Sequence, residues 1–403
     1  MSDVKRFNPN KAEIDLAALR HNYRTILAAN PDGKGIIAVV KADGYGHGLL
    51  EIAQELEHLG TAAFAVAFLN EGIKLRQNGI TCPILIMGGL FDGEETCCLE
   101  QNLSTALFTY HQAEALDKVA GKIGWKAKIH VKIDTGLSRI GISPGESRSF
   151  LERLKGLKNL ELEGVYTQLA SANSSDSLKA AFTDRQIELF REFWLESERQ
   201  GFSPDFIHCA NSAAALSRRL PFCNMVRTGL ALYGATPFDE PQNIDLRPVM
   251  SLKSSIALVK WVDAGTNVSY GLRFSTNRRT LVSSIPIGYG DGYPYSRSGR
   301  SRILVRGEYA DVIGTPCMDW IMADVTDIPG VAPGDEVTLF GYDGAGGCLR
   351  PEELATWNDT IPNQLFCGIT DRIPKMYLNS ACPAGIDSQL QDVNFNAKWN
   401  KER

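Results

Sequence analysis

The sequence predicts an α/β protein in which a (β/α)8 TIM-like barrel, residues 1–245, is followed by a smaller, mostly-β domain, residues 246–379. Short apolar runs alternate with helical stretches in the first part, which is typical of βαβ units and a parallel sheet. About eight such units are present, the number that a closed barrel requires. Beyond Pro248, helical stretches become few, and short β-like runs separated by turn residues follow one another.

Composition and charge exclude several classes. The 403 residues are too many for one small core, and 44% hydrophobic with 22% charged residues is ordinary for a soluble protein. A net charge of −5 gives no sign of the excess of basic residues that nucleic-acid-binding proteins carry, so we expect no nucleic-acid partner. Residues 1–6 lack the apolar core of a signal peptide, and the longest apolar run, Ala62–Leu69, is too short to span a bilayer. We therefore expect a cytoplasmic protein without a membrane partner.

The cysteines point to neither a metal nor a disulfide framework. There are nine of them, an odd and scattered set without CxxC or CxxC…HxxxH spacing. We expect reduced thiols and no metal site.

The barrel is predicted element by element. Ala12–Leu16 is a short strand candidate that leads into the amphipathic stretch Leu19–Leu27. The barrel strands are expected at Ile36–Val40, Ala63–Phe68, Ile84–Met87, Ala106–Phe108, Ile129–Ile133, Leu160–Tyr166, Phe206–Cys209 and Asn224–Val226. Helices are expected between them at Glu51–Leu59, Glu71–Asn78, His111–Val119, Ser147–Leu157 and Ala181–Gln200. An open doubly wound sheet is the alternative.

The second domain is expected to contain six β-like runs: Ser255–Val262, Arg279–Ile287, Ser301–Val305, Asp311–Ile313, Ile321–Val325 and Glu336–Phe340. The polar tail, residues 380–403, has no clear period, and we expect it to be loosely held.

The stretch Ile36–Gly48 combines a buried strand with a reactive residue type. Ile36–Val40 is apolar and rich in β-branched residues, as in a strand buried on both faces, and Lys41 stands where that strand stops. Gly44–Gly48 follows, a loop too rich in glycine to continue the strand and flexible enough to wrap an anion. A lysine in this position is the arrangement that a Schiff-base lysine needs.

Other polar residues follow the ends of further predicted strands. A solvated loop is the ordinary place for any one of them, but in a β/α barrel the active site collects at the carboxyl ends of the strands. Besides Lys41, the residues in such positions are Lys132, Arg139, Gln168, His208, Asn211, Ser212 and Arg227. Because all of them follow strand ends, we expect their side chains to converge at one end of the barrel.

Several motifs make the chain resemble the alanine racemases, a family of pyridoxal-phosphate enzymes built from a barrel and a β domain. The resemblance extends from Ala12 to about Tyr377. Its motifs are Ala38–Gly48, Lys132–Gly136, Asn211–Ala214, Asn224–Leu230, Val268–Gly271, Ile285–Gly292 and Cys317–Asp319.

The resemblance implies a two-base reaction in a shared site. Lys41 would hold pyridoxal 5'-phosphate covalently and act as a base on one face of the substrate Cα. Tyr270, from the β domain of the partner subunit, would act on the opposite face, which makes a homodimer with shared active sites obligatory. Without the resemblance, Tyr270 would equally well be a strand-end tyrosine packed in a core.

The resemblance also implies a phosphate cradle formed by Tyr45, Ser212 and the backbone of Gly229 and Leu230, and it places Asn211 and Gln168 among the cofactor-binding residues.

Arg227 would meet the pyridine nitrogen, and because an arginine does not give up its proton, the ring nitrogen would stay unprotonated, which favours simple proton return. Arg139 matches the residue that meets the ring hydroxyl and the substrate carboxylate. Lys132 matches a lysine that the family often carries as a carbamate, since an ammonium beside Arg139 would be repulsive. Met318, through its backbone N–H, and Tyr289 would line the partner-subunit side of the substrate entrance.

Two positions depart from the family pattern. Gln168 stands where the family usually has a histidine, so a network of Tyr270, Gln168, Arg227 and His208 would keep its geometry but lose acidity. Asp371 stands where the family usually has a tyrosine that helps to bind the phosphate, and a carboxylate there would repel the phosphate unless Asp371 turns away or a cation such as Arg372 intervenes.

Three functions follow from these features. The first is a racemase that interconverts L- and D-alanine, a small amino-acid substrate, and supplies D-alanine for cell-wall peptidoglycan. The second is a racemase of the same family acting on serine, lysine, arginine or several amino acids, which Gln168 and Asp371 suggest. The third is a barrel-type decarboxylase or a cofactor-holding protein; Cys317–Asp319 counts against the former, and the β domain with Tyr270 counts against the latter.

Overall fold

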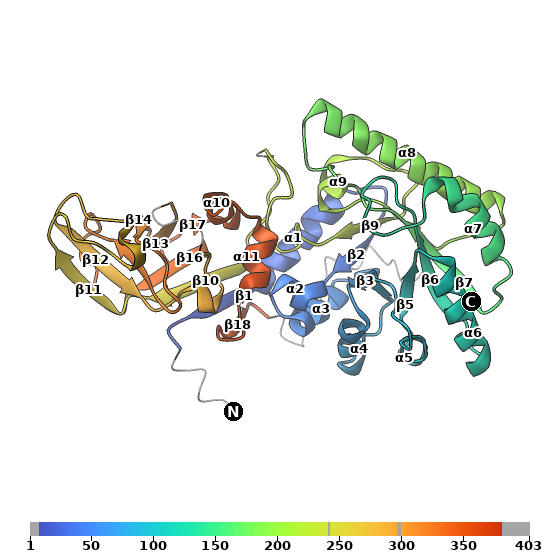
Figure 1. The fold of residues 1–403 in the computed structure, drawn as a ribbon, viewed down its shortest axis with the longest axis horizontal. Coiled ribbons are helices and arrows are strands. Elements are labelled where there is room, and N and C mark those ends of the chain that lie inside the picture. Colours follow the sequence, from blue (N-terminus) through green and yellow to red (C-terminus); the bar gives the residue numbers. More distant parts are fainter. Residues whose placement is uncertain (1–7, 241, 296–299, 381–403) are drawn as a thin grey trace.

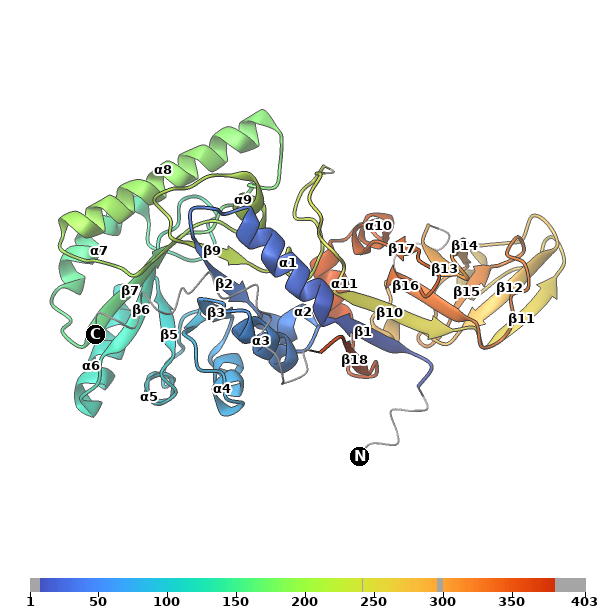
Figure 2. The ribbon, with the colours of Figure 1, turned by 180° about the vertical axis from the view of Figure 1, so that it is seen from behind.

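The computed structural model describes residues 8–240, 242–295 and 300–380. They form two bodies that lie end to end, a barrel wrapped in helices and a sheet domain (Figure 1). Seen from behind, β1 (Lys11–Asp15) runs from the sheet domain into α1 (Leu16–Ala28), which lies on the barrel (Figure 2). The barrel and the mostly-β domain predicted by the sequence are both present.

Eight parallel strands form the barrel. From β2 to β8, each strand pairs with the next in the chain, and β9 pairs with β2, so the sheet curls round to a single seam between β8 and β9. At this seam the Asn224 side chain accepts from the Ile207 N–H at 2.9 Å, and the Arg227 N–H donates to the Ala210 carbonyl at 2.8 Å. The strands are β2 (Gly35–Val39), β3 (Ala63–Val66), β4 (Ile84–Ile86), β5 (Ser104–Leu107), β6 (Ala127–Lys132), β7 (Leu160–Tyr166), β8 (Phe206–His208) and β9 (Met225–Thr228).

All eight barrel strands overlap the predicted ones. Every residue of β2, β3, β4 and β5 is buried, which explains why β2, β3 and β4 appear in the sequence as apolar runs. Because β9 returns to pair with β2, the open doubly wound alternative is excluded.

Helices cover the outside of the barrel (Figures 1 and 2). Asp15, Thr109 and Asp176 begin α1, α6 and α8, each accepting a hydrogen bond from a backbone N–H of the first turn. Besides α1, the helices are α3 (Leu49–His58), α4 (Leu69–Gln77), α5 (Glu95–Glu100), α6 (Tyr110–Ile123), α7 (Ser147–Leu154), α8 (Ser177–Arg199) and α9 (Ser212–Ser217).

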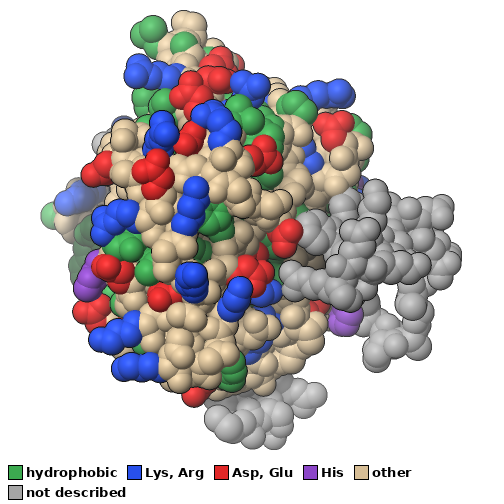
Figure 3. Space-filling view, turned by 90° about the vertical axis from the view of Figure 1, so that its right-hand side faces the viewer, with side chains coloured by type: hydrophobic (Ala, Val, Ile, Leu, Met, Phe, Trp, Pro, Cys, Tyr) green, Lys and Arg blue, Asp and Glu red, His purple; other side chains and the backbone are tan. Residues whose placement is uncertain are grey.

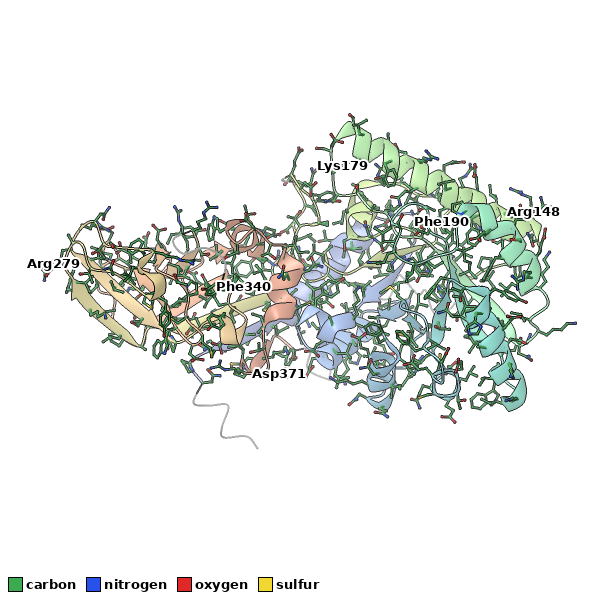
Figure 4. The ribbon with its side chains drawn as sticks, in the orientation of Figure 1. Arg148, Lys179, Phe190, Arg279, Phe340 and Asp371 are labelled. Atoms are coloured by element: carbon green, nitrogen blue, oxygen red, sulfur yellow. The ribbon has the colours of Figure 1, made fainter. Side chains whose placement is uncertain are left out.

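The second body is a ten-stranded, mostly antiparallel sheet. Its strand order is β11-β12-β15-β14-β13-β16-β10-β1-β18, with β17 paired to β16. Phe340 in this sheet and Phe190 on α8 are both fully buried and mark the cores of the two bodies (Figure 4). The strands besides β1 are β10 (Met250–Ser255), β11 (Leu258–Val262), β12 (Thr280–Ile285), β13 (Arg302–Val305), β14 (Glu308–Ile313), β15 (Ile321–Asp324), β16 (Glu336–Tyr342), β17 (Cys348–Leu349) and β18 (Lys375–Leu378).

The second body differs from the sequence prediction in several ways, and its strands β17 and β18 lie in none of the six predicted runs. β1, which the sequence places with the barrel, lies between β10 and β18 of the sheet. The run Ser255–Val262 is not one strand, because β10 pairs with β16 whereas β11 turns to pair with β12. Two short helices, α10 (Pro351–Trp357) and α11 (Pro362–Gly368), are additional, and each has a proline in its first turn, where the missing N–H costs nothing.

Among the described residues, no helix combines the length and the low polarity needed to cross a bilayer. Figure 3 views the barrel end of the molecule, and on that face basic and acidic side chains are interspersed. Residues 381–403 of the predicted polar tail lie outside the described part of the chain.

Candidate active site

A cavity of about 610 Å³ opens at the carboxyl ends of the barrel strands. The structure brings together there most of the residues that the sequence singles out, although their roles remain predictions. Those lining the cavity are Lys41, Tyr45, Lys132, Arg139, Gln168, Asn211, Ser212, Arg227, Gly229 and Leu230. This is the face on which β/α barrels carry their active sites.

Lys41 is followed by a left-handed turn, and not by the flexible loop that its glycines suggest. Residues 42–45 all have φ between +52° and +61°, and three of these four are not glycine. Non-glycine residues in this conformation are strained by about 1–2 kcal/mol each. Such strain gathers at functional sites, where the surrounding structure holds it in place.

Two acidic side chains hold this turn. Glu71 on α4 accepts hydrogen bonds from three backbone N–H groups, among them that of Ala42 at 2.7 Å. Asp43 pairs with Lys375 of β18 at 2.9 Å, which ties the turn to the sheet domain. The position of Lys41 is therefore fixed by both bodies.

Burial and positive neighbours lower the pKa of both cavity lysines. For Lys41, burial is the largest cause, Arg139 and Arg227 add to it, and Glu71 opposes it. For Lys132, burial, Arg139 and Arg227 lower the pKa to about 8. A lysine with a lowered pKa presents a neutral, nucleophilic amine more often than an exposed lysine does.

Arg227 lies on the floor of the cavity, 4% exposed, among neutral acceptors. One of its nitrogens donates to His208 Nδ1 at 2.8 Å, and another donates to the Thr167 carbonyl and to Gln168 Oε1, both at 2.9 Å. The Tyr166 ring stacks on His208 with the centroids 4.9 Å apart and lies 5.2 Å from the guanidinium. The Gln168, Arg227 and His208 part of the expected network is thus hydrogen-bonded within one chain.

The opposite edge of the cavity gathers hydroxyl and N–H groups. Ser212 Oγ accepts from the N–H groups of Gly229 at 3.1 Å and Ala231 at 3.3 Å. Asn211 caps α9 through its side chain. A Cβ at Gly229 would lie 2.6 Å from the Tyr45 hydroxyl, so only glycine permits this close approach. Groups of this kind suit an anion.

Tyr270, Tyr289 and Met318 lie outside this cavity. All three belong to the sheet domain, where Tyr270 and Tyr289 each begin a short 3-10 turn. Their side chains are 74%, 42% and 54% exposed. A single chain thus keeps Tyr270 away from the cavity of Lys41 and presents it to the exterior.

Asp371 turns away from the cavity, which is one of the two arrangements that would avoid repulsion of a phosphate there. Asp371 is exposed and lies beneath the junction of the two domains (Figure 4), where it lines a separate hollow of about 450 Å³. The C-terminal residues that line the cavity are Ile361 and Asn363, at the start of α11. The physical reason is that α11 presents its first turn to the cavity, and the segment that follows the helix leads away.

Sequence reasoning missed three residues that shape the site: Tyr166, Glu71 and Asn363. Tyr166 ends β7 two residues before Gln168, so the period of a strand could have found it. Glu71 and Asn363 reach the site only through the left-handed turn and the position of α11, which have no signal in residue spacing.

The cavity occupies the position at which barrel enzymes bind their substrates, and its reactive amine among arginines suits an anionic ligand, so the protein is an enzyme of the (β/α)8-barrel class. Profiles described as "Alanine racemase, N-terminal domain" and "Alanine racemase, C-terminal domain" match residues 14–237 and 249–377. The chain belongs to the alanine racemase family, a family of isomerases.

Relatives match over nearly their full length. An alanine racemase of Geobacter sulfurreducens is 52% identical over 372 residues, which cover 92% of this chain and 97% of that protein. One of Desulfovibrio desulfuricans is 41% identical, with 92% and 98% covered. Among solved structures, the alanine racemase from D-cycloserine producing Streptomyces lavendulae has a TM-score of 0.86 at 31% identity, with 95% of this chain and 99% of that chain covered. The alanine racemase from Bacillus anthracis with bound L-Ala-P has a TM-score of 0.84 at 31% identity, with 93% and 96% covered.

Proposed function

We propose that this protein is a pyridoxal-phosphate-dependent alanine racemase, which interconverts L- and D-alanine. The observation that carries the proposal is the cavity in which Lys41, Arg139 and Arg227 converge, in a chain of the alanine racemase family. The enzyme would act in the cytoplasm, and its D-alanine would be used for cell-wall peptidoglycan, as the family resemblance implies.

The residues of the cavity fit pyridoxal phosphate. A volume of about 610 Å³ accommodates a pyridine ring with its phosphate and a small amino acid. Tyr45, Ser212 and Gly229 form an edge suited to the phosphate, and Lys41 supplies an amine of lowered pKa for the aldehyde. When bound, the cofactor supplies an electron sink that makes the Cα–H bond of the amino acid acidic.

Two bases on opposite faces of Cα account for racemisation. Lys41, just after β2, takes or returns the proton on one face. Tyr270 of the partner subunit serves the other face, which agrees with its exposure of 74% and its location outside its own chain's cavity. The active unit is then a homodimer with two shared sites, and Tyr289 and Met318 of the partner subunit line the substrate entrance.

Two arginines would bind and orient the cofactor and the substrate. Arg227 would donate to the ring nitrogen of the bound cofactor and keep its own proton, which would weaken the electron sink and favour return of the proton to Cα over other chemistry. Arg139 would hold the substrate carboxylate and the ring hydroxyl. A carbamate on Lys132 would place a negative charge, instead of an ammonium, beside the two arginines that lower its pKa.

Racemisation of L-alanine in deuterium oxide tests the function. The cofactor-loaded protein should form Cα-deuterated D-alanine faster than it converts L-serine, L-lysine or L-arginine. Lys41→Ala should abolish this reaction together with the visible absorption of covalently held cofactor. Failure to racemise any of these amino acids, with the cofactor firmly bound, would overturn the proposal.

The second candidate, a racemase for another amino acid, rests on Gln168. Its amide keeps the hydrogen bond to Arg227 at 2.9 Å but cannot carry a proton at neutral pH. Asp371 gives this candidate no support, because it is exposed outside the cavity. Faster turnover of serine, lysine or arginine than of alanine would favour it.

A further inference from the structure

A continuous chain of buried side chains leads from the cavity into the barrel interior. Arg227 donates to His208 Nδ1 at 2.8 Å, His208 Nε2 lies 3.1 Å from His130 Nδ1, and His130 Nε2 lies 3.2 Å from Glu163 Oε2. These four side chains come from β9, β8, β6 and β7, and none belongs to a residue more than 5% exposed. Only Arg227 among them lines the cavity.

Glu163 ends this chain as a buried anion. Besides His130, the Ser104 hydroxyl donates to its carboxylate, and the Lys128 ammonium lies 3.2 Å from its other oxygen. Burial opposes ionisation, but the hydrogen bond from His130 and the other donors outweigh burial and lower the pKa of Glu163 to about 2. The carboxylate is therefore charged at neutral pH and can only accept hydrogen bonds.

The two end groups admit one arrangement of protons. Arg227 can only donate, so His208 Nδ1 must accept and the ring carries its proton on Nε2. That Nε2–H donates to His130 Nδ1, and His130 in turn donates from Nε2 to Glu163. Burial, followed by the charge of Arg227, lowers the pKa of His208 well below its usual value, which keeps this ring neutral.

This series of hydrogen bonds also connects the positive charge of Arg227 to the negative charge of Glu163. Within the described residues, the hydrogen bonds of the guanidinium go to His208, the Thr167 carbonyl and the Gln168 amide, all of them neutral. A buried cation with only neutral acceptors is held at a cost. Hydrogen bonds in series polarise one another, so the negative charge of Glu163 makes His208 Nδ1 a stronger acceptor for the Arg227 guanidinium.

We propose that Glu163 is a positioning residue for racemisation, which acts through His130 and His208 to hold Arg227 in one orientation toward the cofactor ring. The inference rests on the proposed function, because it takes Arg227 to face the cofactor. Glu163 and His130 do not line the cavity and so act at a distance from the substrate. In the other tautomer of His208, an Nδ1–H would face a donor of Arg227, and their hydrogen bond would be lost.

Two variants separate positioning from packing. Glu163→Gln keeps the size of the side chain and removes its charge. Lys128 can only donate, so it then binds the oxygen of the new amide, and the NH2 group faces His130. His130 Nε2 must accept from this NH2 group, so the proton of the His130 ring moves to Nδ1. Glu163→Asp keeps the charge but is shorter. If the Glu163 carboxylate acts by positioning, Glu163→Asp should be more active than Glu163→Gln. If Glu163 only fills space, Glu163→Gln should be the more active of the two.

We expect Glu163→Gln to lower kcat about tenfold, the equivalent of one lost hydrogen bond, with KM for alanine nearly unchanged. Glu163→Asp should recover part of this loss. Glu55→Gln is the matched control: Glu55 is also buried, 7% exposed, and pairs with Arg20 at 2.6 Å outside the chain of histidines. It should leave kcat unchanged.

Nitrogen NMR of the imidazole rings provides a readout that does not depend on turnover. In protein labelled with 15N-histidine, with and without cofactor, His208 and His130 should both carry a proton on Nε2, and Nδ1 of each ring should be an acceptor. Glu163→Gln should replace this pattern by a mixture of tautomers, and Glu163→Asp should restore it. Unchanged nitrogen signals together with unchanged kcat in Glu163→Gln would overturn this inference alone. Absence of racemisation in the unaltered protein would instead overturn the proposed function.

Discussion

At the scale of single residues, Lys132 is prepared for chemistry by its surroundings. Burial, Arg139 and Arg227 lower its pKa to about 8, so a far larger share of its amine is neutral near that pH than in an exposed lysine. We expect carbon dioxide to add to this amine, with a new N–C bond and release of a proton. Because only the neutral amine reacts, the carbamate fraction should rise as the pH increases through about 8.

This prediction can be checked by 13C NMR of the protein equilibrated with 13C-bicarbonate across that pH range. A carbamate carbonyl signal should appear in the unaltered protein and be absent from Lys132→Met. A signal that persists in Lys132→Met would assign the carbamate to another lysine, and no signal at any pH would refute the modification.

At the scale of elements, the left-handed turn after β2 depends on Glu71. Its carboxylate accepts from the N–H groups of Ala42 and Ala67 at 2.7 Å and of Phe68 at 3.1 Å. Glu71→Ala should lower the free energy of unfolding by about 2–3 kcal/mol, because bonds to a charged acceptor are lost. It should also weaken cofactor binding, since the turn positions Lys41. Denaturant unfolding and cofactor titration measure the two effects.

Glu57→Ala is the control for this prediction. Glu57 also accepts from two backbone N–H groups, those of Thr81 at 2.7 Å and Cys82 at 2.9 Å, but it lies away from the cavity. It should lose comparable stability and keep the cofactor affinity. Equal loss of affinity in both variants would mean that the effect of Glu71→Ala is general instability.

The elements also explain what the sequence could predict. Most residues of the barrel strands are buried, so most of these strands leave a local apolar run, and polar residues at their ends mark the cavity. The left-handed turn at residues 42–45 could not be foreseen, because bonds from Glu71 and Lys375, distant in sequence, hold it. The same applies to β1, whose place in the second sheet is decided by β10 and β18. Long-range pairing, and not local propensity, decided these features.

At the scale of the molecule, the fold places the two proposed bases on different bodies. Lys41 lies in the barrel cavity, whereas Tyr270 is 74% exposed on the sheet domain. β1 and the pair of Asp43 with Lys375 join the bodies firmly within one chain, so closing the gap by bending the chain would break these contacts. Completion of the site by a second copy leaves both bodies as they are, and symmetric dimers provide two such sites.

Mixing two defective variants tests this division. Lys41→Ala and Tyr270→Phe should each fail to racemise alanine. In a mixed dimer with shared sites, one site contains both substitutions and the other contains neither. Random pairing makes half of the dimers mixed, so co-expression should restore about one quarter of the activity per site. If each chain used its own Lys41 and Tyr270, no site in the mixture would be intact and activity would stay absent. Co-expression of Lys41→Ala with a Lys41→Ala/Tyr270→Phe double variant is the control and should restore nothing under either arrangement.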